Sequence, residues 1–271
     1  MNNFHQLCLS IIQLKDANAK CLQIKQLANN FKQGENFDFS AQAVNSIPEP
    51  GRPAKPELVS PLAVPKRRTG SREGHAGLIH SLTHIEFNAI NLAMDACYRF
   101  QGLPREYYAN WLEVAAEEAY HFSLLNTHLQ SLGFAYGDFV AHNGLWDMAV
   151  RTEHDCLVRM ALVPRVLEAR GIDAIPAVQN KLAQLNDSAG VTILDIIQRD
   201  EIKHVSYGNN WFNYLCQERK LDPQITFFQL LHEYNAPKIR GAFNRMGRKQ
   251  AGFSDQELEQ LLALNQEVTH A

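Results

Sequence analysis

The chain carries one pattern twice, as Glu117-Glu118-Ala119-Tyr120-His121 and as Asp200-Glu201-Ile202-Lys203-His204. In each string an acidic residue precedes a Glu-x-x-His sequence, and each string lies inside a long stretch with helical periodicity. Residues three apart are about 300° apart around an α-helix, so the Glu and the His share one face. A carboxylate oxygen beside an imidazole nitrogen suits iron or manganese better than calcium. The repeated strings therefore predict a metal site inside a helical protein.

A two-metal site in a four-helix bundle needs two further Glu residues, one from each remaining helix. Glu86 is flanked by apolar residues at helical spacing, as an inward ligand should be. The third helix offers both Glu153 and Glu168. The interval from Glu168 to Glu201 nearly equals the interval from Glu86 to Glu118, whereas the interval from Glu153 to Glu201 is much longer. We choose Glu168 because its spacing matches the first half, and we keep Glu153 as the alternative.

The predicted metal ligands are Glu86, Glu118, His121, Glu168, Glu201 and His204. Four carboxylates would offset the charge of two divalent ions, and bridging carboxylates would hold these ions close together. We expect two Fe ions, while Mn or a mixed Fe/Mn pair fits the same ligands. The competing interpretation, six surface salt-bridge partners, makes the repeated spacing a coincidence.

The acid that precedes each Glu-x-x-His suggests a supporting role. Asp200 and Glu117 lie one residue, about 100°, from the inward Glu, so each could accept the second N–H of a metal-bound His from a neighbouring helix. Asp200 acting on His121 is the more specific half of this expectation. A partly exposed helical acid is the alternative for each.

Composition narrows the class of protein. The 271 residues are 45% hydrophobic, enough for a substantial core, and the net charge of −3 gives no general basic field for nucleic acid. The five cysteines are odd in number and contain no Cys-x-x-Cys, which favours reduced thiols. No signal-peptide pattern and no run of 18 apolar residues is present. We expect a soluble cytoplasmic protein that does not enter a membrane.

The periodicity predicts an all-α fold, a four-helix bundle with extra helices at both ends and an extended Pro-rich segment. The expected parts are an N-terminal helical segment (1–44), a Pro-rich strap (45–76), the bundle with the metal site (77–220) and a C-terminal helical extension (221–271). The helices are expected at 4–32 (one or two), 77–100, 104–131, 143–170 with a kink at Pro164, 191–219, 226–233 and 254–265, with a loop at 244–253.

The Pro-rich strap has two interpretations. Six prolines exclude a regular helix, and a flexible linker is the simpler alternative. We prefer an ordered strap, because Leu58, Val59, Leu62 and Val64 supply apolar anchors. Its basic residues could meet phosphate or RNA, although a solvated patch is the commoner role.

Several other residues invite a function. His80 and His84 form an i,i+4 pair, for which a supporting or surface role is preferred over metal binding. Tyr120 and Tyr207 could serve near the site, although core packing is commoner. The third-helix arginines are expected to form solvated pairs: Arg151, Arg159, Arg165 and Arg170.

The order Glu, Glu-x-x-His, Glu, Glu-x-x-His resembles the ferritin-like di-iron carboxylate superfamily. More narrowly, the chain resembles an uncharacterised bacterial ferritin-like family, a domain of unknown function. The matching strings are Ile47-Pro48-Glu49-Pro50-Gly51-Arg52-Pro53, residues 80–90, residues 117–125, Glu168-Ala169-Arg170-Gly171-Ile172-Asp173, residues 200–205 and residues 244–253. The resemblance implies a ferritin-like bundle with a di-metal centre, and it supports Glu168 over Glu153. It implies no particular reaction.

Three functions compete at this point. The first is an oxidoreductase that activates oxygen or peroxide and takes an unknown small-molecule substrate or redox partner. The second is a di-iron monooxygenase that modifies tRNA, a reaction found in one member of the wider superfamily, which would make nucleic acid a partner. The third is a metal-binding or interaction protein without turnover. A homodimer is compatible with each.

Overall fold

The computed structural model describes residues 2–65, 67–236 and 242–266, and the side chains as far as Leu264. Its regular elements are helices, and the described residues contain no β-strand, only two isolated bridges. No helix in this described part is long and apolar enough to cross a membrane. The all-α class predicted from the periodicity is therefore confirmed. The chain divides into two compact units, Met1–Glu153 and His154–Ala271.

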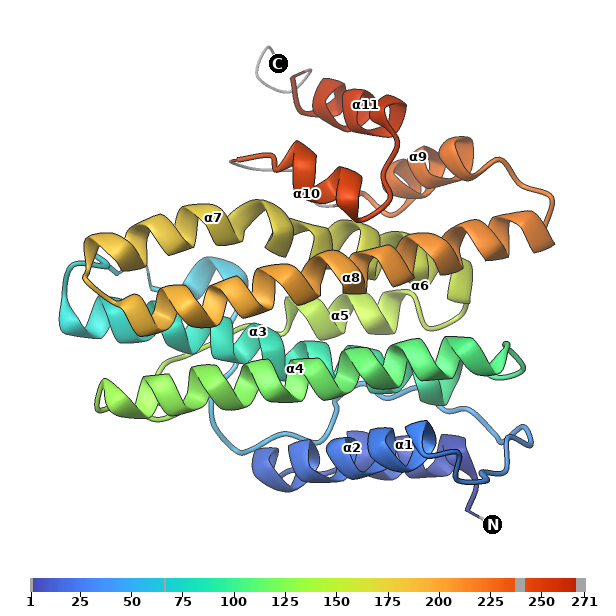
Figure 1. The fold of residues 1–271 in the computed structure, drawn as a ribbon, viewed down its shortest axis with the longest axis horizontal. Helices are drawn as coiled ribbons and strands as arrows, with labels where there is room; N and C mark the ends of the chain where they lie inside the picture. The colour runs from blue at the N-terminus through green and yellow to red at the C-terminus, as the bar shows by residue number, and fades with distance from the viewer. Residues whose placement is uncertain (1, 66, 237–241, 267–271) are drawn as a thin grey trace. The chain divides into compact units, whose positions relative to one another are not determined.

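The first unit is built on one long helical hairpin. Helix α3 (Arg72–Arg99) lies beside α4 (Arg105–Ser131) along most of its length (Figure 1). Two shorter helices, α1 (Phe4–Ile12) and α2 (Ala17–Lys32), pack on α3 and α4 respectively, and α5 (Gly144–Arg151) packs on α3. The N-terminal stretch 4–32 is thus two helices, one of the two forms expected.

Local signals set the ends of the α3–α4 hairpin. The side chain of Ser71 accepts the N–H of Gly74, so α3 begins at Arg72, more than one turn before its predicted start. The helix ends before a tight connection in which Gly102 has φ of +79°, a conformation that favours glycine. Pro104 precedes the first residue of α4, as the sequence indicates. The observed end of α3 and the observed start of α4 therefore lie within one residue of their predicted positions.

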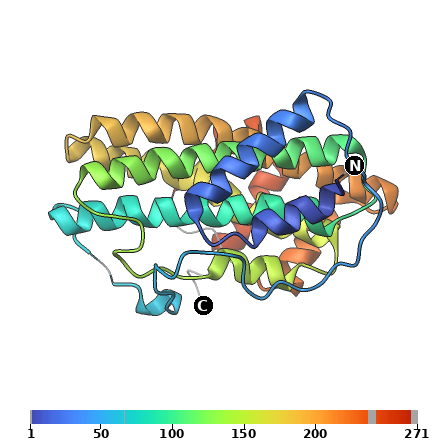
Figure 2. The ribbon, with the colours of Figure 1, turned by 90° about the horizontal axis from the view of Figure 1, so that it is seen from below.

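The Pro-rich segment of the first unit follows the outside of the helices, and its described residues before α3 form one short 3-10 turn, Pro61–Ala63 (Figure 2). It is held by its backbone: Val59 donates its N–H to Ala141 O at 2.8 Å, and Ala141 donates to Glu57 O at 3.0 Å. The predicted apolar anchors are only partly right. Leu62 is 99% exposed, because the 3-10 turn points it into solvent, whereas Leu58 is half-buried.

The second unit is built on a second hairpin. Its first arm consists of α6 (Cys156–Leu162), a π-helical segment (Val163–Glu168) and α7 (Ala169–Gln184); its second arm is α8 (Ser188–Glu218). The predicted single helix over 143–170 is therefore wrong. This range holds α5, α6, the π segment and the first two residues of α7, and helical structure continues through Gly171 to Gln184.

The π segment has an identifiable cause. Pro164 has no N–H to donate, so the regular i→i−4 pattern is interrupted there. The ring of Pro164 lies against Gly208 of α8, where an added Cβ would come within 2.3 Å of the proline Cβ. Only glycine lets the two arms approach this closely.

Among the described residues of the second unit, three short helices follow the hairpin: α9 (Pro223–Glu233), α10 (Arg245–Gln250) and α11 (Asp255–Gln266). The predicted capping box is confirmed, since Ser254 and Glu257 each accept the other's backbone N–H. The predicted loop over 244–253 is wrong for its centre. Asn244 accepts the N–H of Gly247 and starts α10.

Buried arginines tie these helices to the hairpin. Arg248 of α10 donates to both carboxylate oxygens of Asp173 on α7, from Nε to Oδ1 at 3.0 Å and from Nη2 to Oδ2 at 2.7 Å. Arg165 of the π segment contacts Glu257 and lies over the ring of Phe227 at 4.0 Å. Solvated pairing is therefore the wrong expectation for Arg165 and also for Arg159, which is buried.

Candidate metal centre

Three predicted ligands lie together in the first unit. Glu86 comes from the middle of α3, while Glu118 and His121 come from one face of α4. Nδ1 of His121 is 3.1 Å from Oε2 of Glu86 and 3.4 Å from Oε2 of Glu118. Ligand atoms of the three residues all lie within 4.8 Å of one another. One ion with ligands at about 2.1 Å needs nearly this spacing.

This cluster is removed from water. The side chains of Glu118 and His121 are fully buried, and Glu86 is 3% exposed. The rings of Phe87 and Phe122, each one residue from a predicted ligand, are buried as well. The predicted ligands are thus shielded from water, in surroundings where an ionised carboxylate is costly.

Electrostatics in the cluster favour a cation. Burial and, after it, the neighbouring Glu118 raise the pKa of Glu86 to about 8, against the opposite effect of His121. Two carboxylates and one imidazole, held within a few ångströms, form a donor set that fits a divalent transition metal. The residues present in the first unit therefore fit the group that the sequence implies.

The remaining three predicted ligands belong to the hairpin of the second unit. Glu201 and His204 are buried on α8, one turn apart. Glu168 is half-buried and is the last residue of the π segment. A Cβ on Gly171 would lie 3.7 Å from both Cδ and Oε2 of Glu201, so this carboxylate lies against α7 one turn after Glu168. The union of both sets in one centre stays a prediction.

The acids predicted to support the ligands differ in burial. Glu117 is half-buried on α4. Asp200 is 6% exposed on α8 and accepts hydrogen bonds from Nε and Nη2 of Arg199 at 2.8 and 3.1 Å. Its expected hydrogen bond with His121 stays a prediction.

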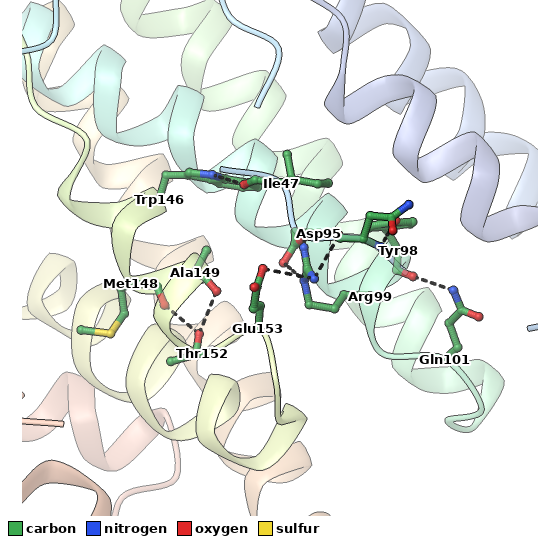
Figure 3. Close-up of polar contacts among 11 residues, drawn as sticks. Ile47, Asp95, Tyr98, Arg99, Gln101, Trp146, Met148, Ala149, Thr152 and Glu153 are labelled. Carbon is green, nitrogen blue, oxygen red and sulfur yellow. Dashed lines mark hydrogen bonds and ion pairs between the residues drawn. The ribbon is translucent and has the colours of Figure 1, made fainter. Parts of the chain in front are cut away.

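Glu153, the alternative to Glu168, forms an ion pair with a buried arginine of α3. One of its carboxylate oxygens is 3.4 Å from Nη1 of Arg99, and Arg99 also donates to the buried Asp95 (Figure 3). Trp146 in the same region donates its indole N–H to Ile47 O at 2.9 Å. Glu153 therefore ties the residues after α5 to α3, while Trp146 ties α5 to the Pro-rich segment.

A supporting or surface role is expected for His80 and His84 from the sequence, and their burial contradicts the surface half of this expectation. His84 lies 2.8 Å from the hydroxyl of Tyr136 and 3.1 Å from the carbonyl oxygen of His142. His80 accepts the backbone N–H of Gly137 at 3.0 Å. Both imidazoles thus bind the connection after α4, a role that their i,i+4 spacing alone does not reveal.

Two further expectations concern aromatic and basic residues. Tyr120 does not pack in the core; it is 53% exposed on α4, whereas Tyr207 on α8 is half-buried. Sequence reasoning also missed Lys20, which is fully buried and donates to Ile12 O, Gly51 O and Asn91 Oδ1. A lysine on an amphipathic helix normally signals the solvent face, so no sequence signal marks this one.

Comparison with known proteins identifies the family. A family model described as "Protein of unknown function (DUF455)" matches residues 13–259. An uncharacterised protein of Haemophilus influenzae is 51% identical over 221 residues, which cover 79% of this chain and 77% of the relative. The solved structures yield no significant match. The chain therefore belongs to the DUF455 family of proteins of unknown function.

Proposed function

We propose that this protein is a ferritin-like di-metal carboxylate protein, with iron as the preferred metal, and that it acts as an oxidoreductase on oxygen or peroxide and an unidentified substrate. The observation that carries the proposal is the buried cluster of Glu86, Glu118 and His121. Charged side chains are almost never fully buried unless they are paired or coordinate a metal.

The energetic cost of burying the cluster argues against a purely structural role for it. Two carboxylates that share one imidazole repel each other, and burial makes their ionised forms costly, as the raised pKa of Glu86 indicates. Hydrophobic residues of similar size would usually stabilise such a position at least as well. A divalent cation supplies the charge that the cluster lacks.

The second ligand set supports a two-metal version of the proposal. Glu201 and His204 repeat the Glu-x-x-His of Glu118 and His121, and each pair is buried in the central part of a long helix. Glu168 ends a π segment, a feature frequently found at functional sites. We propose that the two sets act together, in the arrangement of a ferritin-like four-helix bundle spanning 77–220.

In this function the bound iron would supply the redox chemistry. The chain supplies charge balance, since four carboxylates offset two divalent ions, and the imidazoles of His121 and His204 complete the ligand set. The apolar residues around Glu86 and Glu118 exclude bulk water, which strengthens the electrostatic interactions inside the cluster.

The first experiment measures metal content and oxygen uptake. Full-length protein loaded anaerobically with Fe(II) should bind two ions per chain and consume oxygen, and its Mössbauer spectrum should show two coupled ferric ions. Glu118→Gln and Glu201→Gln should each lose at least one ion and the oxygen uptake. Glu113→Gln, an exposed glutamate of α4, is the matched control and should keep both.

The outcomes separate the competing functions. Absence of oxygen uptake by the iron-loaded protein would refute the oxidoreductase. If Glu118→Gln lowers only the thermal midpoint, the metals fix the fold and catalyse nothing. Two uncoupled ions would refute the joint centre and leave two separate sites. A tRNA nucleoside that is lost in a deletion strain would favour the tRNA-modifying monooxygenase over a small-molecule substrate.

A further inference from the structure

A cavity of about 260 Å³ opens on the first unit, beside the Pro-rich segment. Its walls are formed by one face of α3, by Leu145 of α5, by residues 139–142 of the connection after α4, and by four residues of the Pro-rich segment: Val64, Pro65, Arg67 and Thr69. Two glycines of α3 let the segment come close: an added Cβ would meet Arg68 O within 1.9 Å at Gly74 and Arg67 Cδ within 3.3 Å at Gly77. The segment therefore packs closely on α3 and forms one side of the cavity.

The cavity lies on a different face of α3 from the metal ligand Glu86. Its α3 residues include Gly77, Ser81 and His84, which repeat at helical spacing along one side of the helix. Glu86 follows His84 by two residues and so points to about 200° away from it. This cavity is consequently separate from the cluster of the proposed function.

The lining combines an apolar body with positive and hydrogen-bonding groups. Leu78, Ile85, Phe139 and Leu145 supply the apolar surface, and Arg67, Thr69, Ser81 and His142 supply polar groups. Among the described residues that line the cavity, none is Asp or Glu. Asp138, the neighbour of Phe139, accepts the N–H of Ala135 at 2.7 Å and so has a partner of its own.

Two of these polar groups are held ready for an anion. The guanidinium of Arg67 lies over the ring of Phe139 at 4.8 Å, which fixes its position while leaving its N–H donors at the edge. Nδ1 of His142 accepts the N–H of Gly144 at 3.1 Å, so the neutral ring carries its proton on Nε2, a second donor. His84, by contrast, is committed to Tyr136 and His142 O and forms part of the wall.

We propose that this cavity binds a small organic acid, whose carboxylate pairs with Arg67 and whose apolar body lies between α3, Phe139 of the connection after α4 and Leu145 of α5. The planar guanidinium matches a carboxylate with two parallel hydrogen bonds. The volume suits a molecule of about a dozen non-hydrogen atoms, at the small end of ligand pockets. The site goes beyond the proposed function and does not depend on bound metal.

The test measures binding of benzoate, phenylacetate and hexanoate to the full chain by calorimetry and ligand-observed NMR, with and without added metal. At least one acid should bind saturably with Kd at or below about 1 mM, and its uncharged amide should bind at least about tenfold more weakly. Arg67→Gln should weaken the acid about tenfold. Arg105→Gln, which removes an arginine lying over Phe31 at 4.6 Å outside the cavity, should change nothing.

Three results would overturn the proposal: no binding of any of the three acids, equal binding of acid and amide, or unchanged binding by Arg67→Gln. Ser81→Phe places a ring in the cavity from an exposed position of α3 and should abolish binding at an unchanged thermal midpoint. Because Arg67 is exposed, Arg67→Gln should fold normally and can still test the proposed site if Ser81→Phe fails to fold. Metal loss with intact acid binding would affect only the proposed function.

Discussion

Glu86 should make the metal-free protein less stable as the pH rises. Its pKa is raised from 4.5 to about 8 in the folded protein, chiefly by burial and then by Glu118. The folded state therefore holds a proton that the unfolded state has released between these two pH values. The free energy of unfolding must fall as the pH rises from 4.5 through 8, because the folded state binds more protons there.

The magnitude follows from the shift. At pH 7 the folded carboxyl is still protonated, about 2.5 pH units above the usual pKa of 4.5, and one unit corresponds to about 1.36 kcal/mol. At pH 7 the raised pKa of Glu86 thus lowers the free energy of unfolding by about 3 kcal/mol. Glu86→Gln places a neutral group of the same shape there, so it should stabilise metal-free protein by up to this amount. For a chain of this size the thermal midpoint should rise by about 6–10 °C.

The assay is urea and thermal unfolding of chelator-treated protein at pH 5, 7 and 8.5. Wild type should lose stability across this range, and Glu86→Gln should lose markedly less. With a divalent metal present the order should reverse, because the ion stabilises the wild type and binds the variant weakly. Glu113→Gln should follow the wild type throughout. A metal-free Glu86→Gln variant less stable than wild type at pH 8.5 would refute the reasoning.

Three further predictions test the packing. Burial lowers the pKa of His80 to about 4, with His84 and Arg67 acting in the same direction and Asp138 against it, so the stability that neutral His80 contributes should be lost as the pH falls from 6.5 through 4. The loss in the free energy of unfolding, measured by urea unfolding, should be at most about 3 kcal/mol. His80→Gln, which still accepts the N–H of Gly137, should make stability depend less on pH in this range. Lys20→Met should lower the free energy of unfolding by about 3 kcal/mol, because buried carbonyl groups lose their donor. Lys25→Met on the exposed face of α2 should lower it by less than about 0.5 kcal/mol, and equal losses in the two variants would contradict the burial of Lys20. Gly208→Ala should lower stability by about 1–3 kcal/mol despite the better helix propensity of alanine, since the added Cβ meets Pro164, and Asn210→Ala on the same helix is its exposed control.

The sequence predicts those parts of the fold that local signals control. The start of α4 follows from Pro104, and the start of α11 follows from the capping box of Ser254. Helix α7 could not be predicted in this way. Gly171 and Pro176 both indicate a helix end, yet the helix continues through them because the hairpin with α8 favours it. Tertiary packing outweighs local preference there.

Burial of charge is the second limit of prediction from sequence. Arg165, Arg248 and Lys20 all read as solvent-facing residues, since charged side chains seldom lie in a core. Each is buried against partners far away in the chain, such as Glu257 for Arg165 and Asp173 for Arg248. No spacing within one helix records such a partner. Acids at the spacing of metal ligands are the exception, because that spacing lies within one helix and is visible in the sequence.

The nearly equal intervals from Glu86 to Glu118 and from Glu168 to Glu201 acquire a physical meaning from the two hairpins. In the first hairpin, the stretch from Glu86 to Arg99, the last residue of α3, is as long as the stretch from Arg105, the first residue of α4, to Glu118. At a rise of about 1.5 Å per residue both carboxylates lie about 20 Å from the turn, and therefore at one level.

The second hairpin follows the same rule with one difference. The stretch from Ser188, the first residue of α8, to Glu201 is matched on α7 by the stretch from Gly171 to the last residue, Gln184. Gly171 is indeed the residue against which the Glu201 carboxylate lies. Glu168 is one turn further from the loop, in the π segment that Pro164 imposes. The spacing therefore predicts the level of a proposed ligand to within one helical turn, and the one-turn difference of Glu168 lies in the π segment.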